Sequence, residues 1–474
     1  MCFRIIIKLV DALTVNREPS AAGASESEAW KGEALALFQH LLSAEFFFLA
    51  LQKAGVAENN RVYTSAVVIW LMIWQRLQQG YGTLEGAVLA LLVGLPPSFW
   101  PEPCKRLEDA AKQGGRRLCS HTGAYNKARQ ELSLAVVEQS CDHTFEQLVE
   151  QARGERRPAF MLDGSTVRMP HTDALVEAYP PTCNQHGESH GAILRVLVAS
   201  DLYTGLAMRA EWGPLNGSQA VSEQGLLERA IDRLPSGAVL LGDSNFGVFS
   251  VAYTAVQRGH PVVLRLTTAR AQRLAGGLLR DGIDQRSVWR PSRDDRRSHP
   301  GLSAQACVEG RLIVRQVQPS NGEAAFLLAV FTTLTDPPEE ICKLYGYRWR
   351  IETDLRTLKT TLRMDELTCT TPSMVAKEMN LGLLAYNLVR AVIYLAAEKA
   401  GLEPRRFSFT RVRNVIQAFT PRITACRDPR RAQKLIEDML YYVGQAQLPK
   451  RNNKRPSYPR AKWPEPKSYP SRHG

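Results

Sequence analysis

The sequence predicts an α/β protein in which a domain built around a mixed β-sheet lies between two helical regions. Three observations support this fold class. Apolar residues recur every three or four positions over residues 28–140, as they do in amphipathic helices. From residue 157 onward, short apolar runs typical of strands alternate with helical stretches. Helical periodicity returns at residue 339 and continues toward the C-terminus.

The strand signals lie in the middle of the chain. We predict strands at 160–162, 192–198, 206–210, 238–241 and 261–266, with helices near 218–233 and 248–258. The alternation breaks over residues 267–323, where short strand-like pieces surround an arginine-rich stretch, and we interpret this segment as a β-rich insertion. A helical region follows over residues 373–449. Residues 450–474 are rich in Pro, Lys and Arg, which is typical of an extended tail.

Composition narrows the class of protein further. The chain has 474 residues, of which 44% are hydrophobic, so a sizeable core is available and disorder of the whole chain is excluded. Lys and Arg number 60 against 47 Asp and Glu, and this surplus indicates an anionic partner such as nucleic acid. No apolar run reaches about 18 residues, and the nine cysteines contain no C-x-x-C pair. We therefore expect a cytoplasmic protein that neither is exported nor enters a membrane.

Two aspartates directly follow apolar strand segments. Asp163 comes after residues 160–162, and Asp243 comes after residues 239–242. Ligands of α/β sheets bind at the carboxyl ends of strands, where carboxylates on neighbouring strands can face one another. Two close carboxylates repel unless a cation lies between them, so the pair is compatible with a Mg²⁺ or Mn²⁺ site. Asp-Gly after a strand is also a common turn, and that interpretation stays open for each aspartate alone.

A stronger signal lies in residues 345–362. Plotted on an α-helix at about 100° per residue, four polar side chains share a stripe about 60° wide. These are Tyr345, Arg348, Glu352 and Lys359, and the adjacent stripe holds Ile351, Leu355, Leu358 and Leu362. An ordinary surface helix places its polar residues opposite the core, so the two abutting stripes predict a site at a domain edge. The alternative is a surface helix with a salt bridge between Arg348 and Glu352.

The spacing of these four polar residues resembles the signature helix of DDE transposases of the insertion-sequence-four family. The segments 163–166 and 242–247, which contain Asp163 and Asp243, agree with it. Looser similarities lie at 122–129, 458–460 and 467–470, so the resemblance spans most of residues 115–474.

The resemblance implies an RNase H-like catalytic core over residues 151–372, interrupted by the β-rich insertion at about 267–323. It implies a helical DNA-binding region over residues 1–150. Asp163, Asp243 and Glu352 would then be the catalytic residues, and they would bind two Mg²⁺ or Mn²⁺ ions.

The same resemblance assigns DNA contacts. Tyr345, Arg348 and Lys359 would hold backbone phosphates of the transposon end. The insertion would supply an aromatic residue that stacks on a flipped base, with Phe326 as the first candidate and Trp289 as the second.

The implied activity is cut-and-paste transposition. The protein would bind the terminal inverted repeats of an insertion sequence, cleave the DNA and transfer the strand. Its partners would be double-stranded transposon-end and target DNA and a second copy of the chain, and it would be associated with the bacterial nucleoid. Two alternatives stay open: a catalytically inactive DNA-binding regulator with the same fold, and a metal-dependent nuclease without strand transfer.

One further cluster carries a weaker signal. Cys183, His186 and His190 have a spacing that suits zinc, but no fourth ligand is evident nearby. The basic tail from Lys450 is expected to lie along DNA phosphates, because flexible cationic segments gain affinity by releasing counterions.

Overall fold

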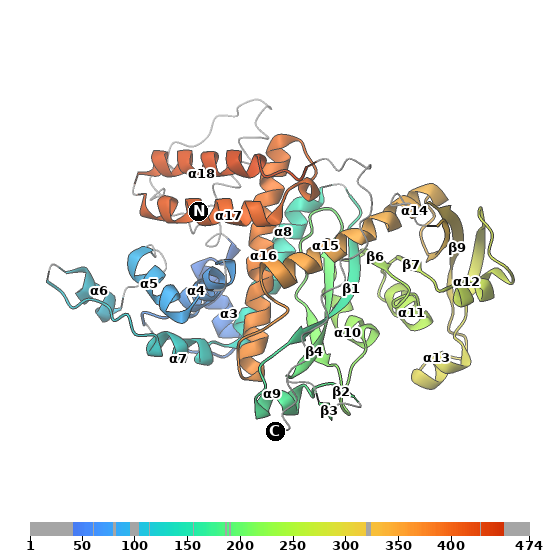
Figure 1. Ribbon diagram of the computed structural model, residues 1–474, viewed down its shortest axis with the longest axis horizontal. Helices are drawn as coiled ribbons and strands as arrows, with labels where there is room; N and C mark the ends of the chain where they lie inside the picture. The colour runs from blue at the N-terminus through green and yellow to red at the C-terminus, as the bar shows by residue number, and fades with distance from the viewer. Residues whose placement is uncertain are drawn as a thin grey trace, which may run out of the picture.

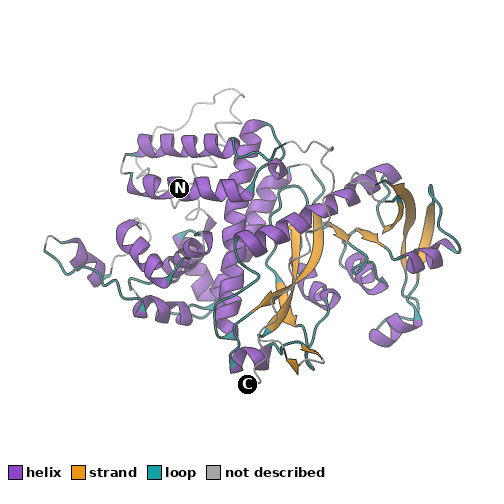
Figure 2. Cartoon of the chain, viewed as in Figure 1, coloured by secondary structure: helices purple, strands orange, loops and turns teal. Residues whose placement is uncertain are grey.

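The computed structural model describes residues 41–449, apart from 60, 79–81, 95–103, 113, 155, 185–186, 189–190, 319–323 and 427. A sheet forms one half of the described protein, and helices from both ends of this part of the chain gather beside it (Figure 1). Figure 2 shows the strands on one side of the molecule with helices around them, while the other side is helical. The predicted tail at 450–474 lies outside the described residues.

The main sheet has eight strands in the order β5-β4-β1-β6-β7-β10-β9-β8. Their bounds are β1 Ala159–Arg168, β4 Ile193–Asp201, β5 Glu211–Pro214, β6 Val239–Gly242, β7 Val262–Arg265, β8 Asp284–Trp289, β9 Val308–Val317 and β10 Phe326–Thr332. The central strands β1, β6 and β7 are parallel, and every other pairing in this sheet is antiparallel. A separate hairpin is formed by β2 (Cys183–Asn184) and β3 (Gly187–Glu188). The predicted α/β class with a mixed sheet is confirmed.

Two details of the predicted strands differ from the structure. Residues 206–210 do not form a strand: Ala207 makes an isolated bridge with Ser200, and the strand β5 begins only at Glu211. The predicted insertion at about 267–323 does not build a sheet of its own. Its strands β8 and β9 continue the main sheet through β10, which pairs with β7. The segment also contains two short helices, so it is less rich in strands than expected.

Short helices connect the strands, and longer ones form the two helical regions. Within the sheet domain these are α9 Asp173–Ala178, α10 Glu223–Ala230, α11 Phe249–Gln257, α12 Thr268–Ala275 and α13 Arg293–Ser298. Before the sheet lie α3 Ala44–Lys53, α4 Ser65–Leu77, α5 Leu84–Gly94, α6 Lys105–Ala111, α7 Gly123–Glu131 and α8 Leu134–Arg153. After it lie α14 Pro338–Gly346, α15 Arg350–Arg356, α16 Pro372–Ala400, α17 Phe409–Ala425 and α18 Pro429–Gly444.

Helix α16 is the central element of the helical half. It is 29 residues long and packs against α4, α8, α17 and α18. Glu378 on α16 forms a buried ion pair with Arg76 on α4 at 2.6 Å, and the Lys377 ammonium donates to the carbonyls of Arg129 and Gln130. Among the described helices, α16 has the length and apolar composition of a membrane span, but most of its apolar stretch is buried inside the protein.

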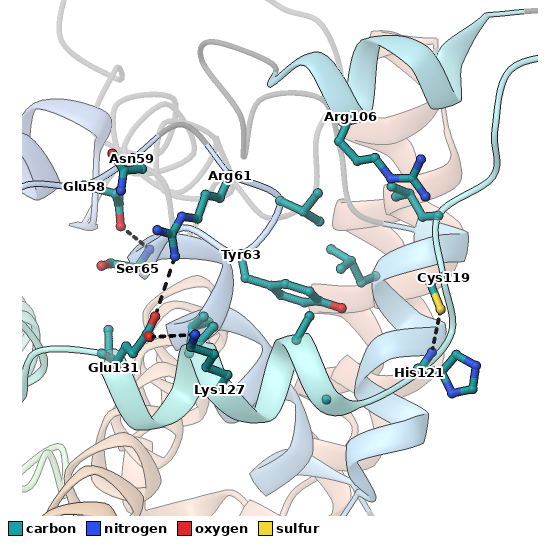
Figure 3. A pocket seen from close by; sticks show the side chains of 18 of the residues that line it. Glu58, Asn59, Arg61, Tyr63, Ser65, Arg106, Cys119, His121, Lys127 and Glu131 are labelled. Carbon is teal, nitrogen blue, oxygen red and sulfur yellow. Dashed lines mark hydrogen bonds and ion pairs between the residues drawn. The ribbon is translucent and has the colours of Figure 1, made fainter.

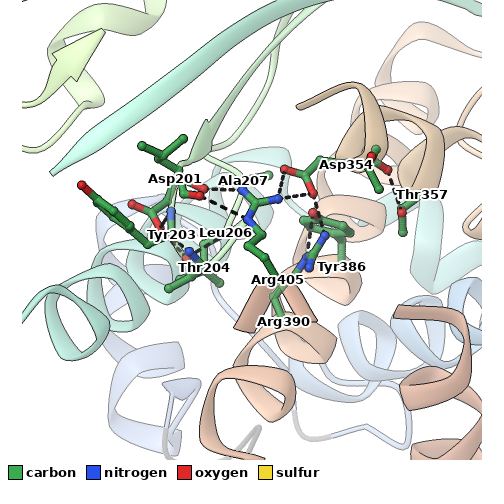
Figure 4. A network of polar contacts seen from close by, with 12 residues as sticks. Asp201, Tyr203, Thr204, Leu206, Ala207, Asp354, Thr357, Tyr386, Arg390 and Arg405 are labelled. Atoms are coloured by element: carbon green, nitrogen blue, oxygen red, sulfur yellow. Dashed lines mark hydrogen bonds and ion pairs between the residues drawn. The ribbon is translucent and has the colours of Figure 1, made fainter. Parts of the chain in front are cut away.

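A buried polar network ties α15 to α16 and to the end of β4 (Figure 4). The Asp354 side chain on α15 is 0% exposed and accepts hydrogen bonds of 2.6 Å from both Arg390 and Arg405. Arg405 also donates to the backbone carbonyls of Asp201 and Leu202, at 2.7 and 3.2 Å. One carboxylate therefore fixes the relative positions of three segments that are far apart in the sequence.

Replacing Asp354 with alanine is expected to lower the free energy of unfolding by about 3–5 kcal/mol, because two arginines would stay buried without their shared anion. Urea denaturation followed by circular dichroism measures this loss. The matched control is Glu366→Gln, which removes the exposed Arg168–Glu366 ion pair at 2.7 Å and should cost at most about 1 kcal/mol. Equal losses in the two variants would show that the Asp354 network is not a major source of stability.

Candidate active site

Asp163 lies at a fork between β1 and β6. The two strands pair in parallel only from Ala159↔Val239 to Met161↔Leu241, after which β6 ends at Gly242. Strand β1 continues to Arg168 and stays paired with β4 alone. The sequence predicted Asp163 at the end of a strand, but this residue lies inside β1. Its parallel neighbour β6 ends beside it. Asp243 is the first residue after β6, so both aspartates lie where the two strands separate.

The two aspartates interact electrostatically. Burial raises the pKa of Asp163 to about 6; Arg348 lowers it, and the neighbouring Asp243 and Glu223 carboxylates raise it further. Asp163 itself accepts a hydrogen bond from the Gly164 amide at 2.9 Å. Burial is the main cause of this shift, and the two neighbouring carboxylates add to it. A divalent cation bound between these oxygens would relieve the repulsion, so the donor set fits Mg²⁺ or Mn²⁺.

The turn after β6 holds Asp243 tightly. Its carboxylate accepts from the Asn245 amide at 2.9 Å, and its carbonyl accepts from the Gly247 amide, also at 2.9 Å. A Cβ at Gly247 would lie 1.9 Å from the carbonyl oxygen of Arg265 at the end of β7, so only glycine fits this approach. The sequence 242–247 therefore folds into a compact turn that presents Asp243 at the fork.

The helix that carries Glu352 is not a uniform α-helix. Between α14 and α15 the chain makes a 3₁₀ turn at Tyr347–Trp349, and after α15 a π-helical turn follows at Thr357–Thr361. The hydroxyls of Thr357 and Thr360 donate to carbonyls four residues earlier, which competes with the regular backbone ladder. The predicted stripe angles, which assumed 100° at every step, are therefore wrong for Lys359, which lies within this π-helical turn.

Only one of the two predicted stripes differs in burial from expectation. The apolar stripe of Ile351, Leu355, Leu358 and Leu362 is buried, as predicted. In the polar stripe, however, Tyr345 and Arg348 are only 3% and 5% exposed. Within the described residues, the Tyr345 hydroxyl and Arg348 Nε have no hydrogen-bond partner. Both side chains thus have unsatisfied hydrogen-bond donors in the interior. Electrostatically, Arg348 acts on Asp163, whose pKa it lowers, and Asp243 acts on Tyr345, whose pKa it raises.

Arg348 links Glu352 to Asp163. It forms an ion pair with Glu352 at 3.5 Å, and its charge lowers the pKa of Asp163. The Glu352 side chain is 45% exposed. Across the described ranges, no three His, Cys, Asp or Glu side chains form a group that could hold a metal ion. The gathering of Asp163, Asp243 and Glu352 around shared ions stays a prediction.

The two candidate base-stacking residues have different environments. Phe326, at the start of β10, is 38% exposed and lies 5.7 Å from the guanidinium of Arg265, measured from its ring centroid. Arg265 in turn lowers the pKa of Tyr345, which burial raises. Trp289 is buried and packs edge-on against Phe249 and Phe331. The structure therefore places Trp289 in the core, while Phe326 stays accessible.

Sequence reasoning did not single out Glu223. It is the first residue of α10, after the N-cap Ser222. Its carboxylate accepts a 2.5 Å hydrogen bond from the Asn245 side chain and contributes to the raised pKa of Asp163. An acidic residue in the first turn is common in any helix, so the sequence held no signal that separates this glutamate from a helix-start residue.

A cavity of about 610 Å³ lies in the N-terminal helical region (Figure 3). Its basic lining residues are Arg61, Arg106, Lys127 and His121. Lys127 and Arg61 are both paired with Glu131, whereas Arg106 donates to the carbonyl of Arg117. Of the possible zinc ligands, Cys183 is an exposed residue of β2, and His186 and His190 lie outside the described residues.

The raised pKa of Asp163 predicts a pH dependence of stability in the metal-free protein. Unfolded Asp163 loses its proton near pH 4 and folded Asp163 near pH 6, so the free energy of unfolding should fall as pH rises between these values, by up to about 3 kcal/mol. Asp163→Asn should remove this decline and be more stable than the wild type above pH 6. Urea denaturation in chelator at several pH values tests this, with the exposed Asp294→Asn as control. A wild-type slope in Asp163→Asn would contradict the assignment.

Comparison with known proteins agrees with the geometry. A family model described as a transposase DDE domain matches residues 154–388, which contain all three candidate carboxylates. The transposase InsG for insertion sequence element IS4 of Escherichia coli (strain K12) is 25% identical over 320 residues, covering 65% of this chain and 68% of the relative. The match to the transposase DDE domain, together with the similarity to InsG, identifies the chain as a DDE transposase of the IS4 family.

Proposed function

We propose that this DNA transposase binds the terminal inverted repeats of its own insertion sequence and catalyses metal-dependent cleavage and strand transfer in cut-and-paste transposition. The observation that carries the proposal is the juxtaposition of Asp163 and Asp243 at the β1/β6 fork, with Arg348 ion-paired with Glu352 and lowering the pKa of Asp163. These three carboxylates are the proposed catalytic residues. The coarser activity, that of a DNA transposase, follows from family membership.

The sheet supports an RNase H-like core. Along the chain, the first five strands of the main sheet are β1, β4, β5, β6 and β7. In the sheet they lie side by side in the order third, second, first, fourth, fifth. The first, fourth and fifth of them are parallel, and the second and third run antiparallel to their neighbours. In this arrangement one proposed catalytic aspartate lies in the first strand and the other directly follows the fourth strand, and these two strands are adjacent. We propose that residues 151–372 form this core, with the strands β8 and β9 as its outer extension.

The carboxylates are suited to hold divalent cations. Two Mg²⁺ or Mn²⁺ ions, when bound, would favour deprotonation of a water or a DNA 3′-hydroxyl and stabilise the leaving oxygen of an in-line displacement. Asp163 and Asp243 supply oxygen donors from rigid backbone: one lies inside a paired strand and the other in a turn with two local hydrogen bonds. Glu352 is half exposed on α15, whose position the buried Asp354 fixes.

The basic and aromatic residues around the fork would position the DNA. Arg348 and Tyr345 are buried beside the carboxylates with unsatisfied donors, which suits them to bind phosphate oxygens close to the scissile bond. Lys359 is half buried in the π-helical turn and would contact the backbone farther along. Phe326 is proposed to stack on an extruded base, because its ring is accessible and is next to Arg265.

The N-terminal helical region is proposed to bind DNA outside the active site. Exposed basic residues gather where α6 leads toward α7: Lys105, Arg116 and Arg117. Arg106 joins this group through its hydrogen bond to Arg117 and lines the adjacent cavity. We propose that two copies of the chain hold two transposon ends together, and that the protein acts in the bacterial cytoplasm at the nucleoid.

Glu352→Gln is expected to lower the cleavage rate of a terminal-repeat duplex by roughly 10²-fold or more, because the site loses one anionic oxygen donor. End binding should stay within about twofold, since Glu352 carries a charge that repels DNA. Gel-based cleavage and electrophoretic mobility shift assays with Mg²⁺ measure the two effects, and Glu340→Gln on α14 is the control. A wild-type protein that binds the ends but does not cleave them would favour a regulator instead.

Lys359→Ala is expected to weaken end binding and to reduce the slope of log affinity against log salt by about 0.9, the value of one lost phosphate contact. The matched control is Lys343→Ala on α14, which removes an exposed lysine paired with Glu340. Fluorescence anisotropy at several salt concentrations measures both slopes. If Lys343→Ala and Lys359→Ala changed the slope equally, the effect would reflect net charge and not a specific contact.

A further inference from the structure

A fourth carboxylate lies at the proposed active site. Glu223 begins α10, and its carboxylate lies against the backbone of β1 directly after Asp163. A Cβ at Gly164 would be 2.0 Å from both the carboxyl carbon and Oε1 of Glu223, so the absence of a side chain at Gly164 makes room for this group. The backbone conformation does not require glycine at this position, because Gly164 is part of the regular strand β1 and does not have a positive φ.

The Glu223 carboxylate is also tied to the second aspartate. Its Oε2 accepts from the Asn245 side chain at 2.5 Å, and the Asn245 amide donates to Asp243 at 2.9 Å. Gln224 reinforces the arrangement by donating to the carbonyl and side-chain oxygens of Asn245, at 2.7 and 3.1 Å. Glu223 is therefore held between the residues that follow Asp163 and those that follow Asp243.

This arrangement places the Glu223 carboxylate near those of Asp163 and Asp243, and the nearby Arg195 and Arg348 compensate their charge only in part. Arg195 and Asn245 favour the ionised form of Glu223, but burial and Asp243 oppose it and raise its pKa. On the other side of the fork, the Tyr345 hydroxyl is buried, unpartnered and close enough to feel the charge of Asp243. A bound cation would pair with the crowded carboxylate oxygens, and a phosphate group would accept from the unsatisfied donors.

We propose that Glu223 is a fourth oxygen donor of the catalytic site and helps to hold the divalent cations assigned to Asp163, Asp243 and Glu352. This inference rests on the proposed function. It assigns a role to α10, whose N-terminal residue is thereby brought to the fork, and it explains why a glycine follows Asp163. The Asn245 side chain, in this view, orients the Glu223 carboxylate and does not itself bind the cation.

The test measures Mn²⁺ affinity of the full-length protein without DNA, by isothermal titration calorimetry and by electron paramagnetic resonance of free Mn²⁺. Glu223→Gln should raise the dissociation constant about 10- to 100-fold. Gly164→Ala should have a similar effect, because the added methyl group displaces the carboxylate without removing its charge. The double variant should be no weaker than the weaker single variant, since both changes act on the same contact. Glu228→Gln, an exposed glutamate on the same helix, should match the wild type.

A second readout separates a metal donor from a residue needed for structure. Without metal, Glu223→Gln should unfold at the wild-type temperature or above it, because one of several crowded negative charges is removed. The Mg²⁺ concentration for half-maximal DNA cleavage should rise by the same factor as the Mn²⁺ dissociation constant. A lower unfolding temperature with unchanged Mn²⁺ affinity would overturn the proposal.

The outcomes also distinguish this inference from the proposed function. If Asp163→Asn weakens Mn²⁺ binding but Glu223→Gln and Gly164→Ala do not, Glu223 is not a donor and the three-carboxylate site stands. If the wild-type protein binds no Mn²⁺, both proposals fail. Should Glu223→Gln not fold, Gly164→Ala alone decides, because it keeps every charge in place.

Discussion

The position of Glu352 depends on a carboxylate two residues away that never meets solvent. Asp354 is completely buried and receives hydrogen bonds from Arg390 of α16 and Arg405 of the segment that follows it. Arg405 also donates hydrogen bonds to backbone carbonyls at the end of β4. A rotation or shift of α15 would therefore break contacts to both the helical half and the sheet. Two charged guanidiniums around one anion form a directional restraint, whereas apolar packing alone would tolerate small shifts.

Much of the fold was predictable because it depends on local patterns. The apolar runs 160–162, 192–198 and 261–266 overlap β1, β4 and β7, and the helical periodicity beyond residue 339 corresponds to α14–α18. The join between the sheet and the predicted insertion was not predictable, because the pairing of β10 with β7 connects residues more than 60 positions apart. The π-helical turn was missed for a different reason: it arises from threonine hydroxyls competing for backbone carbonyls, which a fixed angle per residue ignores.

The residues of the candidate site could be proposed from the sequence, but their burial and their neighbours in space could not. Asp163, Asp243 and the spacing from Tyr345 to Lys359 could be read from the chain, since each follows a local motif. Burial of Tyr345 and Arg348 could not, because it is produced by packing of α14 and the following turn against distant strands. Glu223 escaped notice because only the folded chain places it on the backbone of Gly164. The core position of Trp289 likewise follows from Phe249 and Phe331, which are its neighbours only in space.

Helix α16 has a consequence for shortened gene products. It packs against α4 and α8 from the N-terminal region, and it also carries Arg390, which is ion-paired with Asp354 on α15. A frameshift or stop codon before residue 372 would deprive both halves of this shared partner and leave their apolar faces bare. Such polypeptides would be substrates for cellular proteases and would not accumulate. For this architecture, a damaged copy of the gene should therefore be silent and should not interfere with an intact one.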